Sequence, residues 1–224
     1  MLEVSVIEIV GSRHTLTQDA WASGDSILVL ADGVGSWDRH GVDPSLWSHV
    51  LVWEVSNSMN ENPDGDDMVV PIRQALARCR LPGSSTLSAI RFFGDSARTY
   101  NLGDSFWMQI RDGRIVSRSV DTIHPSGTPR QLGRGLDGNL HGADIPDDGT
   151  SQKLQVVDGD TFIVASDGIR TIIDPRTLAE TCSAEPPVAT EILQSLISDI
   201  LDNMGADEGH HDDITVMVAR YESQ

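Results

Sequence analysis

The chain has 224 residues, of which 39% are hydrophobic, so it is long enough to bury a core as one domain. Its 34 acidic and 16 basic side chains give a net charge of −18, and we therefore expect neither nucleic acid nor an anionic membrane surface as a partner. The first ten residues already contain Glu3 and Glu8, and no apolar run reaches the length of a membrane span, which predicts a cytoplasmic protein without a signal peptide.

The first half of the chain carries alternating strand and helix patterns. A period of two predicts strands, a continuous short apolar run predicts a buried strand, and a period near 3.6 with proline in the first turn predicts a helix. The expected elements are strands at 2–10 and 27–31, a glycine-rich irregular loop at 33–41, and helices at 44–59 and 68–79.

The second half begins with four β-like runs separated by Gly-Asp and Asp-Gly turns, a pattern typical of an antiparallel meander. A long segment rich in glycine, proline and aspartate follows, and loops of that length are usually functional or mobile. The expected elements are meander strands at 85–93, 97–102, 105–110 and 114–119, the loop at 120–149, strands at 154–157 and 161–165, a helix at 187–204 and a last strand at 214–220.

The order of these elements separates helices from long antiparallel runs, which indicates an α+β fold and not a doubly wound parallel sheet. No internal repeat and no low-complexity tract marks a second domain. We therefore expect residues 1–224 to form a single domain.

Acidic residues lie at the ends of four of the apolar runs: Asp32, Asp104, Asp167 and Asp212. Carboxylates at strand ends can converge in space while they are far apart in sequence, and clusters of oxygen ligands select Mg²⁺ or Mn²⁺. Asp32 and Asp167 each follow five apolar or small residues, so each carboxylate should lie at the edge of the core, where it needs a metal or a charged partner. The sequence predicts a metal-dependent hydrolase.

Six short segments, in order from residue 17 to residue 216, resemble the PPM (PP2C-type) family of metal-dependent serine/threonine protein phosphatases. They are Thr17-Gln18-Asp19-Ala20, Ala31-Asp32-Gly33-Val34-Gly35, Gly83-Ser84-Ser85-Thr86, Asn101-Leu102-Gly103-Asp104-Ser105, Ala165-Ser166-Asp167-Gly168-Ile169 and Asp212-Asp213-Ile214-Thr215-Val216. The resemblance implies a four-layer αββα sandwich, two antiparallel sheets flanked by helices. It also implies one catalytic domain over 1–224, with 120–149 as its variable flap.

The resemblance further implies a binuclear Mn²⁺ or Mg²⁺ centre. Asp32 would bridge both ions, and Asp167 and Asp212 would complete one of them. The Gly33 carbonyl and, through water, Asp19 would serve the other. A water activated by the metals would attack the phosphorus of a phosphoserine or phosphothreonine ester directly, without a covalent enzyme intermediate.

A third ion in bacterial relatives is held by the Gly-Asp aspartate, here Asp104, with Asp167 and a further aspartate four residues later. That last position is Thr171, so we expect the third site to be weak or absent. Asp104 has an alternative interpretation as an ordinary hairpin-turn residue.

The phosphate-binding region departs from the family pattern. Family members often carry an arginine five residues before Asp19, where this chain has His14 with Arg13 beside it. Because a guanidinium suits phosphate better than an imidazole does, Arg13 is predicted to bind phosphate, with His14 as the alternative contact to phosphate or leaving group. Val34 stands where some relatives have a histidine proposed as the general acid, so the leaving group must take its proton from water or another group.

Three further side chains are assigned to the cleft from their place in loops. Trp37, in the glycine-rich loop after Asp32, is predicted to line the substrate cleft, and Arg130 and Arg134 of the flap are predicted to face it. His210 and His211 next to Asp212 suggest zinc, but adjacent side chains on an extended segment point to opposite sides, so we expect one histidine near the site.

The implied partner is a phosphorylated protein, with a serine/threonine kinase or the targets of that kinase as associated partners, and the protein is expected to be a monomer. A phosphorylated regulator, such as an anti-sigma antagonist, or a small phosphoester is an alternative substrate. The other alternative is a pseudophosphatase that binds a phosphoprotein or a kinase, against which the intact Asp19, Asp32, Asp167 and Asp212 argue. The charge of −18 predicts a preference for basic phosphopeptides.

Overall fold

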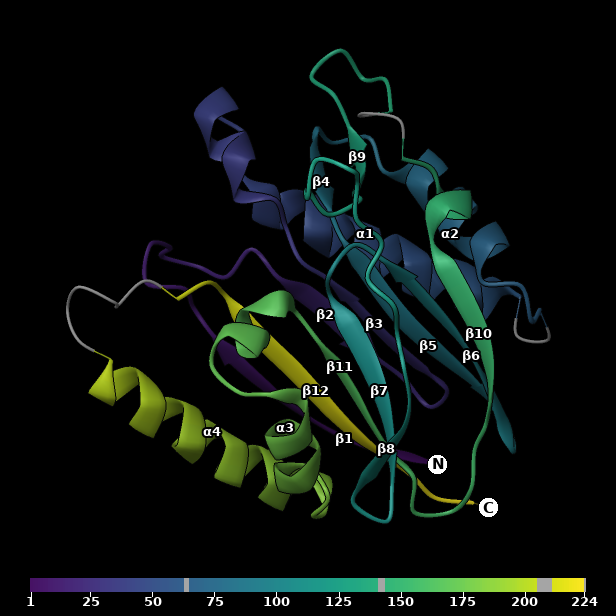
Figure 1. Cartoon of the computed structure of the whole chain (residues 1–224). Coiled ribbons are helices and arrows are strands. Elements are labelled where there is room, and N and C mark those ends of the chain that lie inside the picture. Colours follow the sequence, from purple (N-terminus) through teal and green to yellow (C-terminus); the bar gives the residue numbers. More distant parts are fainter. Residues whose placement is uncertain (63–64, 141–143, 205–210, 224) are drawn as a thin grey trace.

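Two antiparallel sheets packed face to face form the centre of the computed structural model, which describes residues 1–62, 65–140, 144–204 and 211–223 (Figure 1). In the order of the strands across it, sheet 1 comprises β1 (Leu2–Ile9), β12 (Ile214–Tyr221), β11 (Thr161–Ala165), β7 (Phe106–Arg111) and β8 (Arg114–Arg118). Sheet 2 comprises β10 (Thr150–Gln155), β6 (Ser96–Leu102), β5 (Leu87–Phe93), β3 (Ile27–Ala31) and β2 (Ala20–Ser23). A short pair, β4 (Gly83–Ser85) and β9 (Leu132–Arg134), extends beyond sheet 2.

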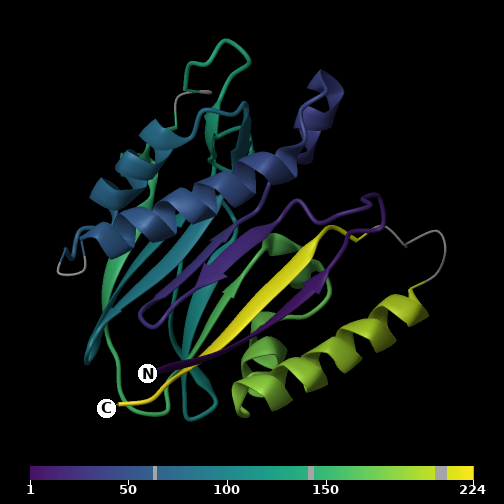
Figure 2. The same ribbon diagram turned by 180° about the vertical axis from the view of Figure 1, so that it is seen from behind.

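Helices cover the outer faces of both sheets. Those over sheet 2 are α1 (Pro44–Glu61) and α2 (Val69–Arg78), and those over sheet 1 are α3 (Pro175–Thr181) and α4 (Pro186–Asn203). Figure 2 shows α1 and α4 on opposite sides of the molecule. The predicted fold class, a four-layer αββα sandwich, is confirmed by this arrangement.

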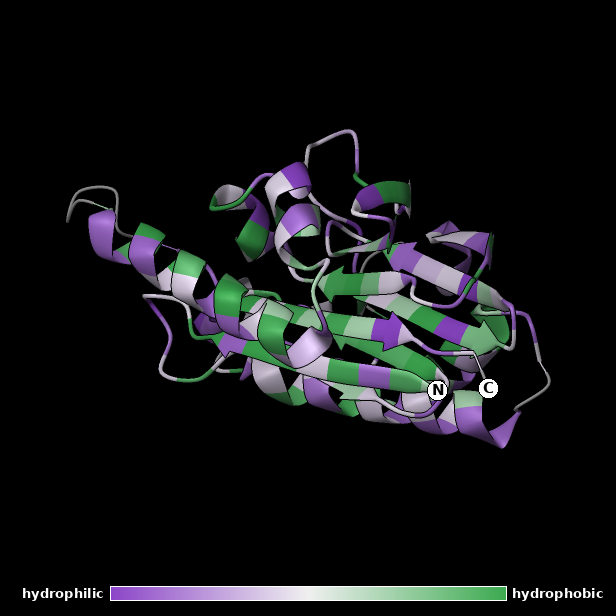
Figure 3. Ribbon diagram, turned by 90° about the horizontal axis from the view of Figure 1, so that it is seen from below, coloured by the Kyte–Doolittle hydropathy of each residue, from purple (hydrophilic) through white to green (hydrophobic). Residues whose placement is uncertain are grey.

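Burial explains why the central strands are apolar without alternation. Every residue of β3 and of β11 is buried, because one face of each strand meets the other sheet and the other face meets a helix layer. The layer between the sheets is built from large side chains such as Leu28, Phe162 and Met217. In Figure 3 the central strands carry most of the hydrophobic residues, whereas the helices alternate between hydrophilic and hydrophobic ones.

Helix starts follow local capping chemistry. Asp43 caps α1 by accepting a hydrogen bond from the backbone N–H of Ser45 at 3.0 Å, with Pro44 in the first turn. Asp174 caps α3 in the same way, with Pro175 following it. The two chain ends lie side by side, and the N–H of Glu222 donates to the Met1 carbonyl at 2.9 Å.

The predicted single meander is wrong. β5 and β6 pair in sheet 2, whereas β7 and β8 pair in sheet 1, so the chain crosses between the sheets after β6. Gly103 makes this crossing with φ of 101°, a conformation that favours glycine. The two strands expected around Asp158-Gly159 are likewise in different sheets, because a turn signal marks a change of direction but does not tell which sheet receives the next strand.

Several elements were missed or misplaced by the sequence patterns. Strand β2, helix α3 and the short strands β4 and β9 were not predicted, and the glycine-rich loop contains the 3-10 helix η1 (Gly35–His40). On α4 the expected apolar face is only partly buried, since Val188 and Ile192 are each 49% exposed. Within the described residues, no helix is long and apolar enough to cross a membrane.

Candidate metal centre

Five aspartates meet at one edge of the sandwich because antiparallel neighbours bring the end of one strand beside the start of the next. In the β2–β3 ladder Ala20 pairs with Ala31, which places Asp19 opposite Asp32. In the β11–β12 ladder Ala165 pairs with Val216, so Asp167 follows β11 at the edge where Asp212 precedes β12. The fifth, Asp104, follows β6 where the chain crosses to sheet 1.

Asp32 is the centre of this group. Burial raises the pKa of the Asp32 carboxyl well above its usual range, and the carboxylates of Asp19, Asp167, Asp212 and Asp104, in that order of effect, raise it further. Each of these four neighbours is negatively charged when it is ionised. A carboxylate in such surroundings either takes up a proton or needs a cation beside it.

Asp19 is fully buried, and only one of its carboxylate oxygens has a protein partner. The Ser166 hydroxyl donates to Asp19 Oδ2 at 2.7 Å, whereas no described residue donates to Oδ1. Burial raises the pKa of Asp19 to about 7. A buried carboxylate oxygen without a donor is costly, so this atom fits a metal ion or metal-bound water.

Ser166 joins the two sheets at the site. While its hydroxyl donates to Asp19 of the sheet 2 edge, it accepts the backbone N–H of Thr215 from β12 in sheet 1 at 2.9 Å. Ser166 belongs to the Ala-Ser-Asp-Gly segment, but the sequence pattern assigns it no role. Only its position directly before Asp167 could have indicated that Ser166 lies at the site.

Asp167 and Asp104 are two of the carboxylates that act on Asp32. Burial raises the pKa of Asp104 to about 6 and also raises the pKa of Asp167, with neighbouring aspartates adding to both shifts. The guanidinium of Arg170 opposes these shifts in both carboxyls. Thr171, in the position that lacks an aspartate, donates its hydroxyl to the Gly168 carbonyl at 2.8 Å.

Asp213 anchors the loop that carries Arg13 and His14. The Asp213 carboxylate, only 4% exposed, accepts the backbone N–H groups of Gly11 at 2.6 Å and Gln18 at 2.7 Å, and its Oδ2 lies 3.0 Å from Nδ1 of His14. Asp213 was missed as a functional residue, although the doubled aspartate at 212–213 was a visible signal. One ligand atom from each of His14, Asp212 and Asp213 lies within 4.8 Å of the others, but Asp213 already accepts three hydrogen bonds.

A cleft of about 490 Å³ opens beside these carboxylates. It is lined by Arg13, His14, Gln18, Gly33, Gly35, Thr171, Met204, His211 and Asp212. The structure thus brings together the two candidate phosphate contacts and two predicted metal ligands, Gly33 and Asp212. His211 is the histidine near the site, whereas His210 lies outside the described residues.

Three cleft assignments are corrected by the structure. Trp37 is 7% exposed and its indole N–H donates to the Ser84 hydroxyl at 2.7 Å, so it packs below the loop and is not among the residues that line the cleft. Arg134 is 8% exposed and binds the Cys79 carbonyl at 2.9 Å, and Arg130 pairs with Asp144 at 2.7 Å. These flap arginines stabilise the chain around them because buried carbonyls and a buried carboxylate need donors.

Several known proteins named as protein phosphatases are similar to this chain. No protein-family model matches the chain. A zebrafish (Danio rerio) protein named protein phosphatase PTC7 homolog is 34% identical over 156 residues, covering 64% of this chain and 52% of that protein. The Arabidopsis thaliana protein named probable protein phosphatase 2C 55 is 29% identical over 178 residues, covering 71% of this chain and 37% of that protein. The chain thus spans from about a third to about three fifths of the length of the first curated relatives it matches.

Solved structures resemble the whole chain. The photosystem II phosphatase PBCP superposes with a TM-score of 0.84 at 21% identity, with 100% of both chains covered. The catalytic domain of the serine/threonine phosphatase PstP, solved with two manganese ions, superposes with a TM-score of 0.72 at 20% identity over 99% of both chains. At these identities the structural matches establish the fold.

Proposed function

Because the chain belongs to the PPM (PP2C-type) family of protein phosphatases, we propose that it is a metal-dependent phosphatase that hydrolyses phosphoserine and phosphothreonine in proteins. The observation that carries this proposal is the convergence of five strand-end aspartates around Asp32, with one buried oxygen of Asp19 left without a donor. Residues 1–224 would form the catalytic domain, with the segment 120–149 as its flap.

We propose two Mn²⁺ or Mg²⁺ ions at this centre, as in the PstP structure. Asp32 would bridge them, Asp167 and Asp212 would hold one, and Asp19 and the Gly33 carbonyl would serve the other. A Cβ at Gly33 would lie 2.5 Å from the Gln18 carbonyl oxygen, so only glycine lets this loop pack closely against the segment that carries Asp19. When bound, such ions acidify water at neutral pH and offset the negative charge of a phosphoryl group.

A third ion is disfavoured because one of its ligands is missing. Asp104 and Asp167 would be its ligands, but Thr171 replaces the remaining carboxylate. The Thr171 hydroxyl instead donates to the Gly168 carbonyl. We therefore infer that this site is weak.

Arg13 and His14 are the proposed substrate-binding residues in the cleft. Asp213 engages Nδ1 of His14 and thereby orients the ring, so that Nε2 is the ring atom left for the phosphate or the leaving group. The loop from Gly11 to Gln18 is tied at both ends to the same carboxylate, which holds Arg13 at the cleft as well. A guanidinium can bind two phosphate oxygens at once, so Arg13 would bind the phosphate and His14 would contact the leaving-group side.

The activity is tested with the whole chain. Hydrolysis of p-nitrophenyl phosphate and of a phosphothreonine peptide should require added Mn²⁺ or Mg²⁺ and stop with a chelator. Metal binding without turnover on either substrate would contradict the proposal and favour a protein that binds phosphoproteins or a kinase without catalysis. Size-exclusion chromatography with light scattering tests the proposed monomer.

Metal binding should stabilise the protein more at high pH than at low pH. The folded pKa of Asp19 is about 7 and that of Asp104 about 6, both above the ordinary 3.8, so the folded chain binds these protons more tightly than the unfolded chain does. The resulting stability is fully present below pH 3.8 and is lost as the pH rises toward 7. Mn²⁺ replaces these protons. At a hundredfold its Kd it should raise the Tm at pH 8 by about 5–10 °C, and clearly less at pH 5.5.

Thermal unfolding at both pH values, with Mn²⁺ and with a chelator, measures this difference. Comparing the two conditions at each pH cancels titrating groups that do not contact the metal. An equal Tm gain at pH 5.5 and pH 8 would contradict the assignment of the raised carboxyl groups to the metal centre. Asp19→Asn should reduce the pH dependence of the gain.

A further inference from the structure

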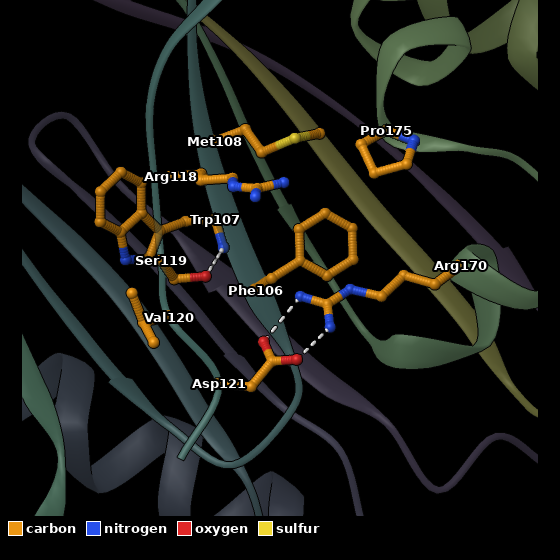
Figure 4. Close-up of a pocket in the computed structure, with 9 residues that line it drawn as sticks. All are labelled: Phe106, Trp107, Met108, Arg118, Ser119, Val120, Asp121, Arg170 and Pro175. Carbon is orange, nitrogen blue, oxygen red and sulfur yellow. Dashed lines mark hydrogen bonds and ion pairs between the residues drawn. The ribbon is translucent and has the colours of Figure 1, made fainter. Parts of the chain in front are cut away.

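A second recess lies next to the proposed catalytic cleft, on the other side of the 3-10 helix η3 (Asp167–Thr171). Its volume is about 480 Å³, and Figure 4 shows that residues of β7, of the segment after β8 and of η3 surround it. Thr171 lines the catalytic cleft, whereas its neighbour Arg170 lines the second recess. Neighbouring residues of this one short helix therefore line the two spaces.

Arg170 forms a fixed wall of this recess and does not act as a free cation there. Its two terminal nitrogens bind the two oxygens of Asp121 at 2.6 and 2.9 Å, and its guanidinium lies 4.2 Å from the centroid of the Phe106 ring (Figure 4). The bidentate pair uses both carboxylate oxygens of Asp121, so its charge is matched inside the wall. Phe106 is only 4% exposed, and this guanidinium lies over its ring.

Arg118 supplies the unmatched charge. It is the last residue of β8, its side chain is exposed, and it has no ion pair with any residue in the described part of the chain. Figure 4 shows its guanidinium extending into the recess between Met108 and Phe106. Counting Arg118, Arg170 and Asp121, the recess carries one net positive charge on a chain of net charge −18. Buried apolar side chains beneath the guanidinium strengthen its attraction for an anion.

We propose that this recess is a subsite for an acidic side chain near the phosphorylated residue of the substrate, and that Arg118 determines this preference. The proposal rests on the proposed phosphatase function. Val120 and Pro175 form an apolar rim that an extended peptide can pack against. Val120 is 62% exposed, and Pro175 lies opposite Arg118 across the recess. The subsite runs against the preference for basic peptides that net charge alone predicts, because short-range recognition depends on the local charge more than on the total.

The test uses the Mn²⁺-loaded full chain and a set of phosphothreonine peptides in which one flanking residue at a time is Asp, Ala or Lys. At one or more positions the wild-type protein should favour Asp over Lys in kcat/KM by about three- to tenfold, as expected for a partly exposed charge pair. In Arg118→Glu the same ratio should fall below one. Arg114→Glu makes the same charge change on β8, about 13 Å away along the strand, and should keep the wild-type ratio because that distance exceeds the screening length.

Turnover of p-nitrophenyl phosphate by the wild-type protein separates this proposal from the proposed function. No turnover on any substrate would overturn the phosphatase assignment itself. Turnover without an acidic preference at any flanking position would overturn the subsite alone. An acidic preference that Arg118→Glu leaves unchanged, or that Arg114→Glu removes equally, would also overturn it.

Discussion

Asp32→Asn is expected to lower metal-dependent turnover about a thousandfold, since losing ~4 kcal/mol of transition-state stabilisation has that effect on the rate. Asp32 is the proposed bridge between the ions and the carboxyl on which four other carboxylates act. Asparagine keeps the shape of the side chain but removes the charge. Both ions should therefore bind more weakly, and the Mn²⁺-dependent gain in Tm should shrink.

Without metal, the same variant should be as stable as the wild type or more stable at pH 8. In the wild type this carboxyl lies buried beside four other carboxylates, which makes its charged form costly, and an amide removes that cost. A variant that merely folds poorly would lose stability with and without metal, so the two explanations give opposite results.

Steady-state kinetics and thermal unfolding with and without Mn²⁺ measure both effects. Asp25→Asn is the matched control, because Asp25 is exposed in the turn at the far end of the same β2–β3 hairpin. Wild-type turnover and a wild-type metal response in Asp32→Asn would show that Asp32 does not hold the metals.

The sequence indicated which aspartates could form the proposed metal centre, but not how the fold brings them together. The aspartates at strand ends were visible because each follows or precedes a strongly apolar run. The pairing of Asp19 with Asp32 was not visible, since it depends on the register of β2, a strand of four residues whose burial does not alternate. Short edge strands give little periodic signal, and their position is set by the neighbouring strand.

Residues that hold the site together were harder to predict than the proposed ligands. Ser166 and Asp213 act through contacts over 147 and up to 202 positions of the chain, and no local pattern encodes such distances. Arg130 and Arg134 were assigned to the cleft because loops often bind substrate. Both instead donate hydrogen bonds to groups inside the fold. The sequence of the loop does not identify these acceptors, because they become neighbours only when the chain folds.

The crossing of the chain between the sheets has a functional consequence that a single meander would not have. Because β6 and β7 lie in different sheets, Gly103 and Asp104 connect the two sheets at the edge where the other aspartates lie. The segment 120–149 begins at the same point, since the N–H of Thr122 donates to the Gly103 carbonyl at 2.9 Å. This hydrogen bond links the start of the proposed flap, and Asp121 of the second recess, to the turn that carries Asp104 of the proposed metal centre.

Gly168→Ala is expected to lower turnover about a hundredfold, the loss typical of a catalytic group displaced by about 1 Å. A Cβ at this position would lie 2.1 Å from the carbonyl oxygen of Asp213, a separation that real Cβ atoms do not show. The obstacle is backbone on both sides, so one segment must move. Gly168 follows Asp167 and Asp213 follows Asp212, so the methyl group separates the two aspartates proposed to hold one ion.

The φ angle of Gly168 is not positive, so alanine can adopt its backbone conformation and the expected effect is steric alone. Overpacking should also cost about 1–3 kcal/mol of folding stability, which thermal unfolding measures. Gly24→Ala is the control, because its Cβ would meet only the Ile27 side chain, at 3.3 Å. If Gly168→Ala turned over substrate at the Gly24→Ala rate, close contact between the Asp167 and Asp213 segments would not position the metal ligands.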